Sequence, residues 1–150
     1  MVDLEEQTKP IEILLVEDNP ADVRLIEETM KDFKSRNVIR LVKDGVEAME
    51  YLKKQGSFAD TERPDIIMLD LNLPKKNGFE LLKEIKENSD LRSIPVVVLS
   101  TSDSQKDITR AYELQASCFV TKPVGLDDFI RTVKQIENFW MNLAKLPDKQ

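Results

Sequence analysis

Short runs of apolar residues recur along the chain, separated by longer stretches in which apolar side chains return every three or four positions. The run at Ile66–Leu69 is too short for a helix and begins with β-branched residues, so it predicts a strand that is buried on both faces. The other runs lie at Ile11–Val16, Asn37–Val42, Ile94–Leu99 and Cys118–Thr121. The pattern therefore predicts five strands.

The stretches with the longer period predict five helices. The first begins at Pro20 with Asn19 as its N-cap, because Asn favours the cap and Pro favours the first helical position. The second starts at Asp44–Gly45 and stops at Gly56, the third ends near Ser89, the fourth spans Ser104–Gln115, and the last runs from Leu126 to about Leu146. Their expected core-facing residues are, in order, Val23, Ile26, Met30 and Phe33; Val46, Met49 and Leu52; Phe79, Leu82 and Ile85; Ile108, Ala111 and Tyr112; and Phe129, Val133, Ile136, Trp140 and Leu143.

Strands that alternate with helices indicate an α/β fold in which helices cover both faces of a parallel sheet. Right-handed crossovers limit the strand order, and the flavodoxin-like order 2-1-3-4-5 is the natural choice for a chain that begins with a strand. In that order the first and third strands are neighbours at the switch point, where open α/β sheets bind their ligands. We therefore predict a doubly wound five-stranded parallel sheet of (βα)5 type.

The composition is typical of one globular domain. The chain has 150 residues, of which 41% are hydrophobic and 33% charged, so we expect a single domain over residues 1–150, with a core at about 10–146 and loose termini at 1–9 and 147–150. A net charge of −6 argues against nucleic acid as a direct partner. No apolar run is long enough to cross a membrane, and the one cysteine, Cys118, cannot form an internal disulfide, so we expect a cytoplasmic protein with a buried structural thiol.

Acidic side chains follow the two strands that meet at the switch point. Glu17 and Asp18 come directly after the first strand, and Asp70 ends the third. Carboxylates in one crevice repel each other and take up protons unless a cation compensates, and their oxygens suit a hard ion such as Mg²⁺ or Mn²⁺. The alternative is that the acids are separate, solvated loop residues.

The ends of the last two strands favour a common site. The fourth strand is followed by the hydroxyls of Ser100 and Thr101, and the fifth by the ammonium of Lys122. A metal, an acidic nucleophile, a hydroxyl and an ammonium at one edge fit the transfer of a phosphoryl group to a carboxylate. Asp70 is the candidate acceptor. With no histidine, the chain cannot itself carry a phosphohistidine.

Four motifs occur in a fixed order, and together they are specific. They are Val16-Glu17-Asp18, Leu69-Asp70-Leu71-Asn72-Leu73-Pro74 with Asn77-Gly78, Pro95 to Ser100, and Phe119-Val120-Thr121-Lys122-Pro123. Over residues 10–140 the sequence resembles the receiver domain of response regulators. The segment Leu71–Gly78 and the tail Ile136–Pro147 resemble, more narrowly, the single-domain regulators that partner bacterial phytochrome histidine kinases.

The resemblance implies that Asp70 accepts a phosphoryl group from the phosphohistidine of a histidine kinase and becomes an acyl phosphate. It also implies a Mg²⁺ site that Asp70 shares. Asp18 matches the direct ligand, Glu17 matches the acid that acts through water, and Asn72 matches the position whose backbone carbonyl completes the coordination. The implied protein is a two-component signalling receiver that assists its own phosphorylation and dephosphorylation, and not an enzyme.

Three further residues match the family's switch. Ser100 matches the hydroxyl that turns toward the phosphoryl oxygens, Lys122 the lysine that pairs with the phosphoryl charge, and Phe119 the aromatic residue that rotates inward. Ser at 100 and Phe at 119 replace the commoner Thr and Tyr, and neither change removes a group that phosphotransfer needs. Taken singly, Ser100 is equally explained as a helix cap, and Phe119 is better explained as ordinary core.

Two other functions share the α/β fold. An aspartyl-phosphate phosphatase of the haloacid-dehalogenase type would need a second acid two residues after the nucleophile, where this chain has Asn72. A flavodoxin-type cofactor module would need a phosphate-binding loop after the first strand, where Glu17 and Asp18 would repel a phosphate. Both alternatives therefore rank below the receiver.

The apolar stripe of the last helix continues for about five turns. A pair of strands offers a surface that buries only about three to four turns of a helix. The terminal turns of the last helix hold Phe139, Trp140, Leu143 and Leu146. These residues either fold back on their own domain or form an apolar partner surface. We expect a symmetric homodimer through the face made by the helix at 104–115, the strand at 118–121 and the last helix. With no residues left for an effector domain, the output would pass through protein contacts.

Overall fold

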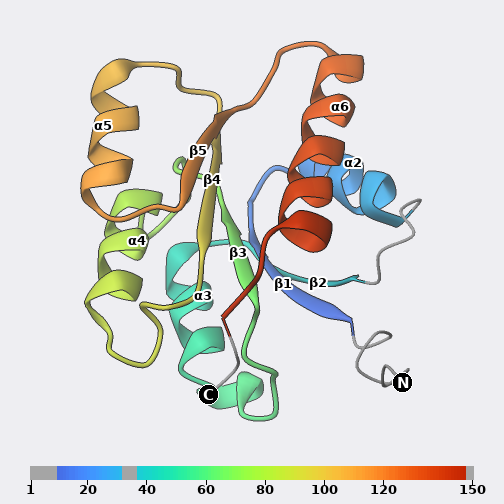
Figure 1. The fold of residues 1–150 in the computed structure, drawn as a ribbon. Helices are drawn as coiled ribbons and strands as arrows, with labels where there is room; N and C mark the ends of the chain where they lie inside the picture. Colours follow the sequence, from blue (N-terminus) through green and yellow to red (C-terminus); the bar gives the residue numbers. More distant parts are fainter. Residues whose placement is uncertain (1–9, 32–36, 148–150) are drawn as a thin grey trace.

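Five parallel strands form one sheet in the order β2-β1-β3-β4-β5, as predicted (Figure 1). The computed structural model describes residues 10–31 and 37–147. The strands are β1 (Ile11–Val16), β2 (Asn37–Val42), β3 (Ile66–Leu69), β4 (Val96–Ser100) and β5 (Cys118–Thr121). β1 and β3 are neighbours with Val16 opposite Leu69, so the ends of both strands lie level at the switch point.

Helices cover both faces of this sheet. They are α2 (Pro20–Lys31), α3 (Gly45–Leu52), α4 (Gly78–Glu87), α5 (Gln105–Glu113) and α6 (Leu126–Glu137), with a 3₁₀ turn η1 (Gly56–Phe58) and a π-helical turn η2 (Asn138–Leu143). α2 and α6 lie side by side on one face, and α3, α4 and α5 cover the other (Figure 1). The doubly wound fold is confirmed.

The strands direct alternate side chains to two cores. In β1, Ile13 and Leu15 pack toward α2 and α6, whereas Leu14 and Val16 pack toward α3, α4 and α5. All four residues of β3 are buried, because this strand lies in the middle of the sheet with helices on both sides. Burial on both faces fixes the register of the central strands, since a slip of one residue would exchange the two faces.

Polar side chains fix where the helices begin. Asn19 Oδ1 accepts hydrogen bonds from the backbone N–H groups of Ala21 and Asp22 at the start of α2, which confirms the predicted N-cap. The cap residues of α3, α4 and α5 likewise accept a bond from an N–H group three residues later; they are Asp44, Asn77 and Ser104. These caps define the first turns of helices that follow directly on the strand ends.

Three of the predicted core positions are wrong, and two of them, Val46 and Tyr112, lie in α3 and α5. Val46 is 40% exposed and Tyr112 is 50% exposed. In α3 the inward face is formed by Ala48, Met49 and Leu52, which leaves Val46 in the first turn outside the core. Tyr112 lies beside the edge strand, where its hydroxyl accepts a hydrogen bond from the Phe119 N–H at 3.2 Å. The predicted core residue Phe33 lies outside the described residues.

The second and last helices end earlier than predicted. α3 stops at Leu52, and the left-handed φ of 56° at Lys54 turns the chain away before Gly56. α6 gives way at Glu137 to the π-helical turn η2, marked by the bond from the Ala144 N–H to the Phe139 carbonyl five residues back.

The wider turn η2 changes which side chains face the sheet. Met141 is buried, Trp140 is half-buried against the core, and Phe139 and Leu143 are 49% and 65% exposed. The predicted stripe therefore holds for Phe129, Val133 and Ile136 and fails at Leu143. Burial raises the pKa of the half-buried Cys118 thiol, and a hydrogen bond with Trp140 offsets this only in part, as suits a structural thiol.

Candidate functional site

Three carboxylates meet at the carboxyl ends of β1 and β3. Glu17 and Asp18 follow β1, Asp70 follows β3, and each offers an oxygen within 4.8 Å of those of the other two. Glu17 and Asp70 are buried, whereas Asp18 is exposed. The level register of the two strands produces this cluster, because the Asp70 N–H also bonds to the Val16 carbonyl at 3.0 Å.

The electrostatics of this cluster suit a bound cation. Burial, with a smaller contribution from the charge of Asp70, raises the pKa of Glu17 to about 7, and hydrogen bonding to Lys122 opposes the rise. A carboxylate held at this pKa is only partly ionised at neutral pH, and a hard cation would favour its ionised form. The donors are oxygens on an edge that stays open at Asp18, which fits an ion that keeps several waters.

Lys122 occupies the same crevice from the end of β5. Its Nζ lies 2.6 Å from Glu17 Oε1, 2.9 Å from Asp22 Oδ2 and 3.8 Å from Asp70 Oδ2. Burial alone would disfavour the ammonium, but the bonds to Glu17 and Asp22 and the charge of Asp70 outweigh it and raise the pKa of Lys122. The lysine is therefore a buried cation held among three acids, with Asp70 the most distant of them.

The backbone around Asp70 leaves little room for adjustment. A Cβ on Gly78 would lie 2.5 Å from Leu71 Cα and 2.7 Å from the Asp70 carbonyl oxygen. The Gly78 N–H bonds to the Leu71 carbonyl at 2.9 Å, and Asp70 Oδ1 accepts the Asn72 N–H at 3.3 Å. The start of α4 thus packs directly on the backbone that carries Asp70, and only glycine fits there.

The structure places the remaining predicted residues as follows. Ser100 is fully buried at the end of β4, where its Oγ accepts the Ser102 N–H at 3.2 Å and its carbonyl accepts the Lys122 N–H at 2.6 Å. Thr101 is exposed. Phe119 is half-buried and packs against the core on the α3, α4 and α5 side. Ser100 therefore adjoins Lys122 through the backbone, while its hydroxyl is bonded within its own turn.

Asp22, the third acid around Lys122, was not a predicted site residue. It lies in the first turn of α2, where an acid is ordinarily explained by the helix dipole. Its only local signal was its position three residues after the Asn19 cap. The contact with Lys122 joins residues 100 positions apart, so the sequence pattern alone could not have found it.

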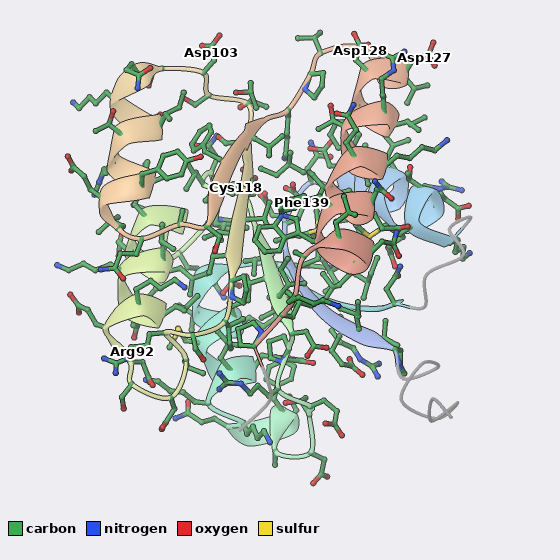
Figure 2. The ribbon with its side chains drawn as sticks, viewed as in Figure 1. Arg92, Asp103, Cys118, Asp127, Asp128 and Phe139 are labelled. Atoms are coloured by element: carbon green, nitrogen blue, oxygen red, sulfur yellow. The ribbon has the colours of Figure 1, made fainter. Side chains whose placement is uncertain are left out.

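Further acids surround the crevice at this end of the molecule. Asp103, Asp127 and Asp128 are exposed near the ends of β4 and β5, at the start of α5 and α6 (Figure 2). Their charges are screened over about 10 Å at ordinary salt concentrations, so they contribute a general negative field, not specific contacts. That field favours the approach of a cation.

A doubly wound sheet with a carboxylate crevice and a buried lysine at its switch point defines a receiver, the phosphoacceptor module of two-component signalling. The family model of the response regulator receiver domain matches residues 13–134, and the chain belongs to that family. It is a signalling protein and not a haloacid-dehalogenase phosphatase or a flavodoxin-type module.

Two known proteins share this domain over nearly their whole length. The response regulator Rcp1 of Synechocystis sp. is 46% identical over 143 residues, which are 95% of this chain and 97% of Rcp1. The probable methanogenesis regulatory protein FilR2 of Methanothrix harundinacea is 38% identical over 145 residues, 97% of this chain and 93% of its own.

Solved structures of similar proteins agree with the fold. The Mn²⁺-bound form of Rcp1 has a TM-score of 0.90 at 46% identity, and the phosphorylated cyanobacterial phytochrome response regulator RcpA has a TM-score of 0.90 at 48% identity. Each match covers 93% of this chain and all of the solved chain. Receivers bind a divalent metal, and the acidic cluster of Glu17, Asp18 and Asp70 offers oxygen ligands for such an ion. Among the described residues, no helix is long and apolar enough to cross a membrane.

Proposed function

We propose that Asp70 is the phosphoacceptor and takes its phosphoryl group from a phosphohistidine of a histidine kinase. The observation that carries this proposal is that Asp70 lies close both to the acids that follow β1 and to the Lys122 ammonium, with its Oδ2 3.8 Å from Nζ. In the transfer a carboxylate oxygen of Asp70 forms a bond to phosphorus as the N–P bond of the phosphohistidine breaks, and the imidazole leaves with the electron pair.

The other residues of the crevice act on the transferred group. Lys122 pairs with the phosphoryl oxygens, and the Ser100 hydroxyl leaves its bond with the Ser102 N–H to donate to one of them. Phe119, which packs next to β4, follows that movement and alters the surface at β5. The same groups stabilise the transition state when water hydrolyses the acyl phosphate, so the domain assists its own dephosphorylation.

The metal in this proposal is Mg²⁺, held by Glu17, Asp18, Asp70 and the backbone carbonyl of Asn72. When bound, it neutralises the charge that collects on the phosphoryl oxygens. The all-oxygen donor set and the partly ionised state of Glu17 support this assignment. Removal of divalent ions with EDTA should stop phosphotransfer, and Asp18→Ala should lose metal binding and phosphoryl acceptance together. Transfer that persists in EDTA would contradict the metal assignment.

The proposed partner is a histidine kinase of the phytochrome type, and the proposed place of this interaction is the cytoplasm. The similarity to RcpA supports this partner. We also propose that residues 1–150 are one receiver domain whose output passes through protein contacts and not through nucleic acid. Profiling phosphotransfer from the purified histidine kinases of the host identifies the partner, and a clear preference for a kinase without a phytochrome module would contradict it.

The assignment of Asp70 is tested by phosphorylation of the purified protein. Incubation with a phosphorylated kinase, or with beryllofluoride and Mg²⁺, should modify the wild type and leave Asp70→Asn unmodified. Asp90→Asn is a matched control, because it removes an exposed acid from the chain without touching the crevice. Continued labelling of Asp70→Asn would falsify the assignment.

We also propose a symmetric homodimer through α5, β5 and α6 with η2. Phe139 and Leu143 support it, because these apolar side chains are largely exposed at one end of this face. Figure 2 shows Phe139 at the end of α6 that is remote from Asp127 and Asp128. Sedimentation of the wild type should give a dimer at micromolar concentration, and the double change Phe139→Ala with Leu143→Ala should give a monomer. A monomeric wild type, with and without beryllofluoride, would exclude this dimer.

A further inference from the structure

The side chain of Asp22 does not make the hydrogen bond that is usual at its position in the helix. Asp22 is the third residue of α2, where an acidic side chain ordinarily reaches back to the N–H of the cap residue. Here the N–H of the Asn19 cap donates to Glu17 Oε2 at 3.3 Å instead. The carboxylate of Asp22 is thereby left for Lys122, with its Oδ2 2.9 Å from Nζ and its side chain only 21% exposed.

The backbone of Asp22 is held in place independently of that contact. Its own N–H and that of Ala21 both bond to Asn19 Oδ1, and Pro20 fixes the first turn of the helix. The carboxylate therefore presents a fixed negative charge to Lys122 from α2. It is outside the group of three acids whose oxygens lie within 4.8 Å of one another.

Two different anions thus compete for one buried ammonium. Lys122 has short bonds to Glu17 and Asp22, while Asp70 Oδ2 remains at 3.8 Å. A cation bound by Glu17 would weaken the first of these bonds, because it withdraws charge from the same carboxylate. It would leave the second unchanged. Asp22 then remains as the partner that Lys122 must share or leave when it pairs with a phosphoryl group on Asp70.

We propose that Asp22 is a positioning residue that holds Lys122 away from Asp70 and thereby sets the balance between the metal-binding and the phosphorylated states. The proposal rests on the function proposed above. In this proposal the charge of Asp22 has opposite effects on the affinity for Mg²⁺ and on the stability of the phosphorylated state. With the Asp22 charge present, less of the ammonium charge falls on the metal ligands, so Mg²⁺ binds more tightly. The phosphorylated state is weakened, because its oxygens compete with Asp22 for Nζ.

The experiment compares these two affinities in the full chain. Asp22→Asn should tighten the binding of beryllofluoride at saturating Mg²⁺ by about three- to tenfold, the net contribution of one hydrogen bond. In the absence of beryllofluoride, the same variant should bind Mg²⁺ about two- to fivefold more weakly, because Lys122 then lies closer to Asp70. Fluorine NMR measures the first affinity and calorimetric titration the second.

Three controls make the result decisive. Asp22→Glu, which restores the charge, should stay within about twofold of the wild type in both affinities, and so should Glu28→Gln, which removes an exposed acid of the same helix.

A purely structural role of Asp22 would weaken both affinities together, and no role would leave both unchanged. Either result, or shifts of reversed sign, overturns the proposal. Asp22→Ser serves as a second variant if Asp22→Asn does not fold. Beryllofluoride binding to Asp70→Asn would instead refute the proposed function itself.

Discussion

The layer formed by α2 and α6 ends in two regions of opposite character. Beside the carboxyl ends of the strands, Glu17 and Lys122 are charged groups that are almost fully buried. At the far end of α6, Phe139 and Leu143 are large apolar groups that are mostly exposed. Both regions depart from the usual distribution of polar and apolar residues, and such departures mark function more reliably than an ordinary core does.

The two regions are maintained by different physics. A buried charge persists only when partners from elsewhere in the chain satisfy it. Lys122, which follows β5, is paired with acids that follow β1 and β3 and with one from α2. An exposed apolar side chain needs no such partner, since the helix beneath it is already anchored by Ile136, Met141 and the half-buried Trp140. The crevice therefore depends on the whole fold, whereas the apolar end depends on one turn.

The largest effect should come from removing the buried ammonium. Lys122→Met leaves Glu17, Asp22 and Asp70 without their cation, and we expect a loss of about 3 kcal/mol in the free energy of unfolding at pH 8. Urea denaturation measures it. Lys31→Met, which removes a lysine whose side chain is 72% exposed, should change stability by less than about 0.5 kcal/mol. Equal losses in the two variants would contradict the difference between buried and exposed charge.

The next effect is a dependence of stability on pH. The folded-state pKa of Glu17 is about 7, above its ordinary value of 4.5. Between these values the unfolded chain has lost a proton that the folded chain keeps, so raising the pH lowers the stability that Glu17 contributes, by up to about 3 kcal/mol. The pKa of Lys122 is also raised, so its contribution is kept up to high pH and lost only above its ordinary range.

Denaturation at pH 5.5 and pH 8 should therefore show a decline with rising pH that Glu17→Gln removes. Saturating Mg²⁺ should reduce the same decline, because the cation favours the ionised carboxylate. A wild type and a Glu17→Gln variant with the same pH profile would contradict the raised pKa of Glu17.

A smaller effect separates the aromatic residues at the far end of α6. Trp140→Ala removes a side chain packed against the core and should cost about 2 kcal/mol, below the value for a fully buried aromatic. Phe139→Ala should change the stability of the isolated domain by less than about 0.5 kcal/mol, although the centroids of the Phe139 and Trp140 rings are 5.2 Å apart. Thermal unfolding at low protein concentration tests this order, and a larger loss for Phe139→Ala would refute it.

The smallest effect should come from an ion pair outside the crevice. On α6, a guanidinium nitrogen of Arg131 (Nη1) lies 2.7 Å from Asp128 Oδ1, and the two side chains are 66% and 62% exposed. Solvent and salt screen such pairs, so Asp128→Asn should change stability by less than about 0.5 kcal/mol. A loss comparable to that of Lys122→Met would mean that burial does not set the strength of these interactions.

The fold could be predicted because its determinants are local. The apolar runs give the strands, the Asn19 cap and Pro20 give the start of α2, and alternation gives the parallel sheet. The prediction that Leu143 faces the core is wrong for a physical reason. A period of 3.6 residues per turn does not continue past Glu137, because η2 widens the turn there.

The candidate site was predictable for the same reason that the sheet was. The strand ends that carry Glu17, Asp18, Asp70 and Lys122 must meet at one edge once the strand order is known. The ion-pair partners of each side chain do not follow from the strand order. The preference of Lys122 for Glu17 and Asp22 over Asp70 is a matter of 2.6 and 2.9 Å against 3.8 Å, and no sequence pattern reports such distances.

The hydroxyl of Tyr112 has a consequence for assembly. β5 is an edge strand, and an unpaired N–H on such an edge is a template for the addition of a foreign strand. Tyr112 occupies this position by accepting the Phe119 N–H. Two copies therefore cannot join their β5 edges at Phe119 into one continuous sheet without first displacing the phenol. Tyr112 therefore opposes aggregation through this edge, and the dimer proposed above would have to form through side chains and not through shared backbone pairing at Phe119.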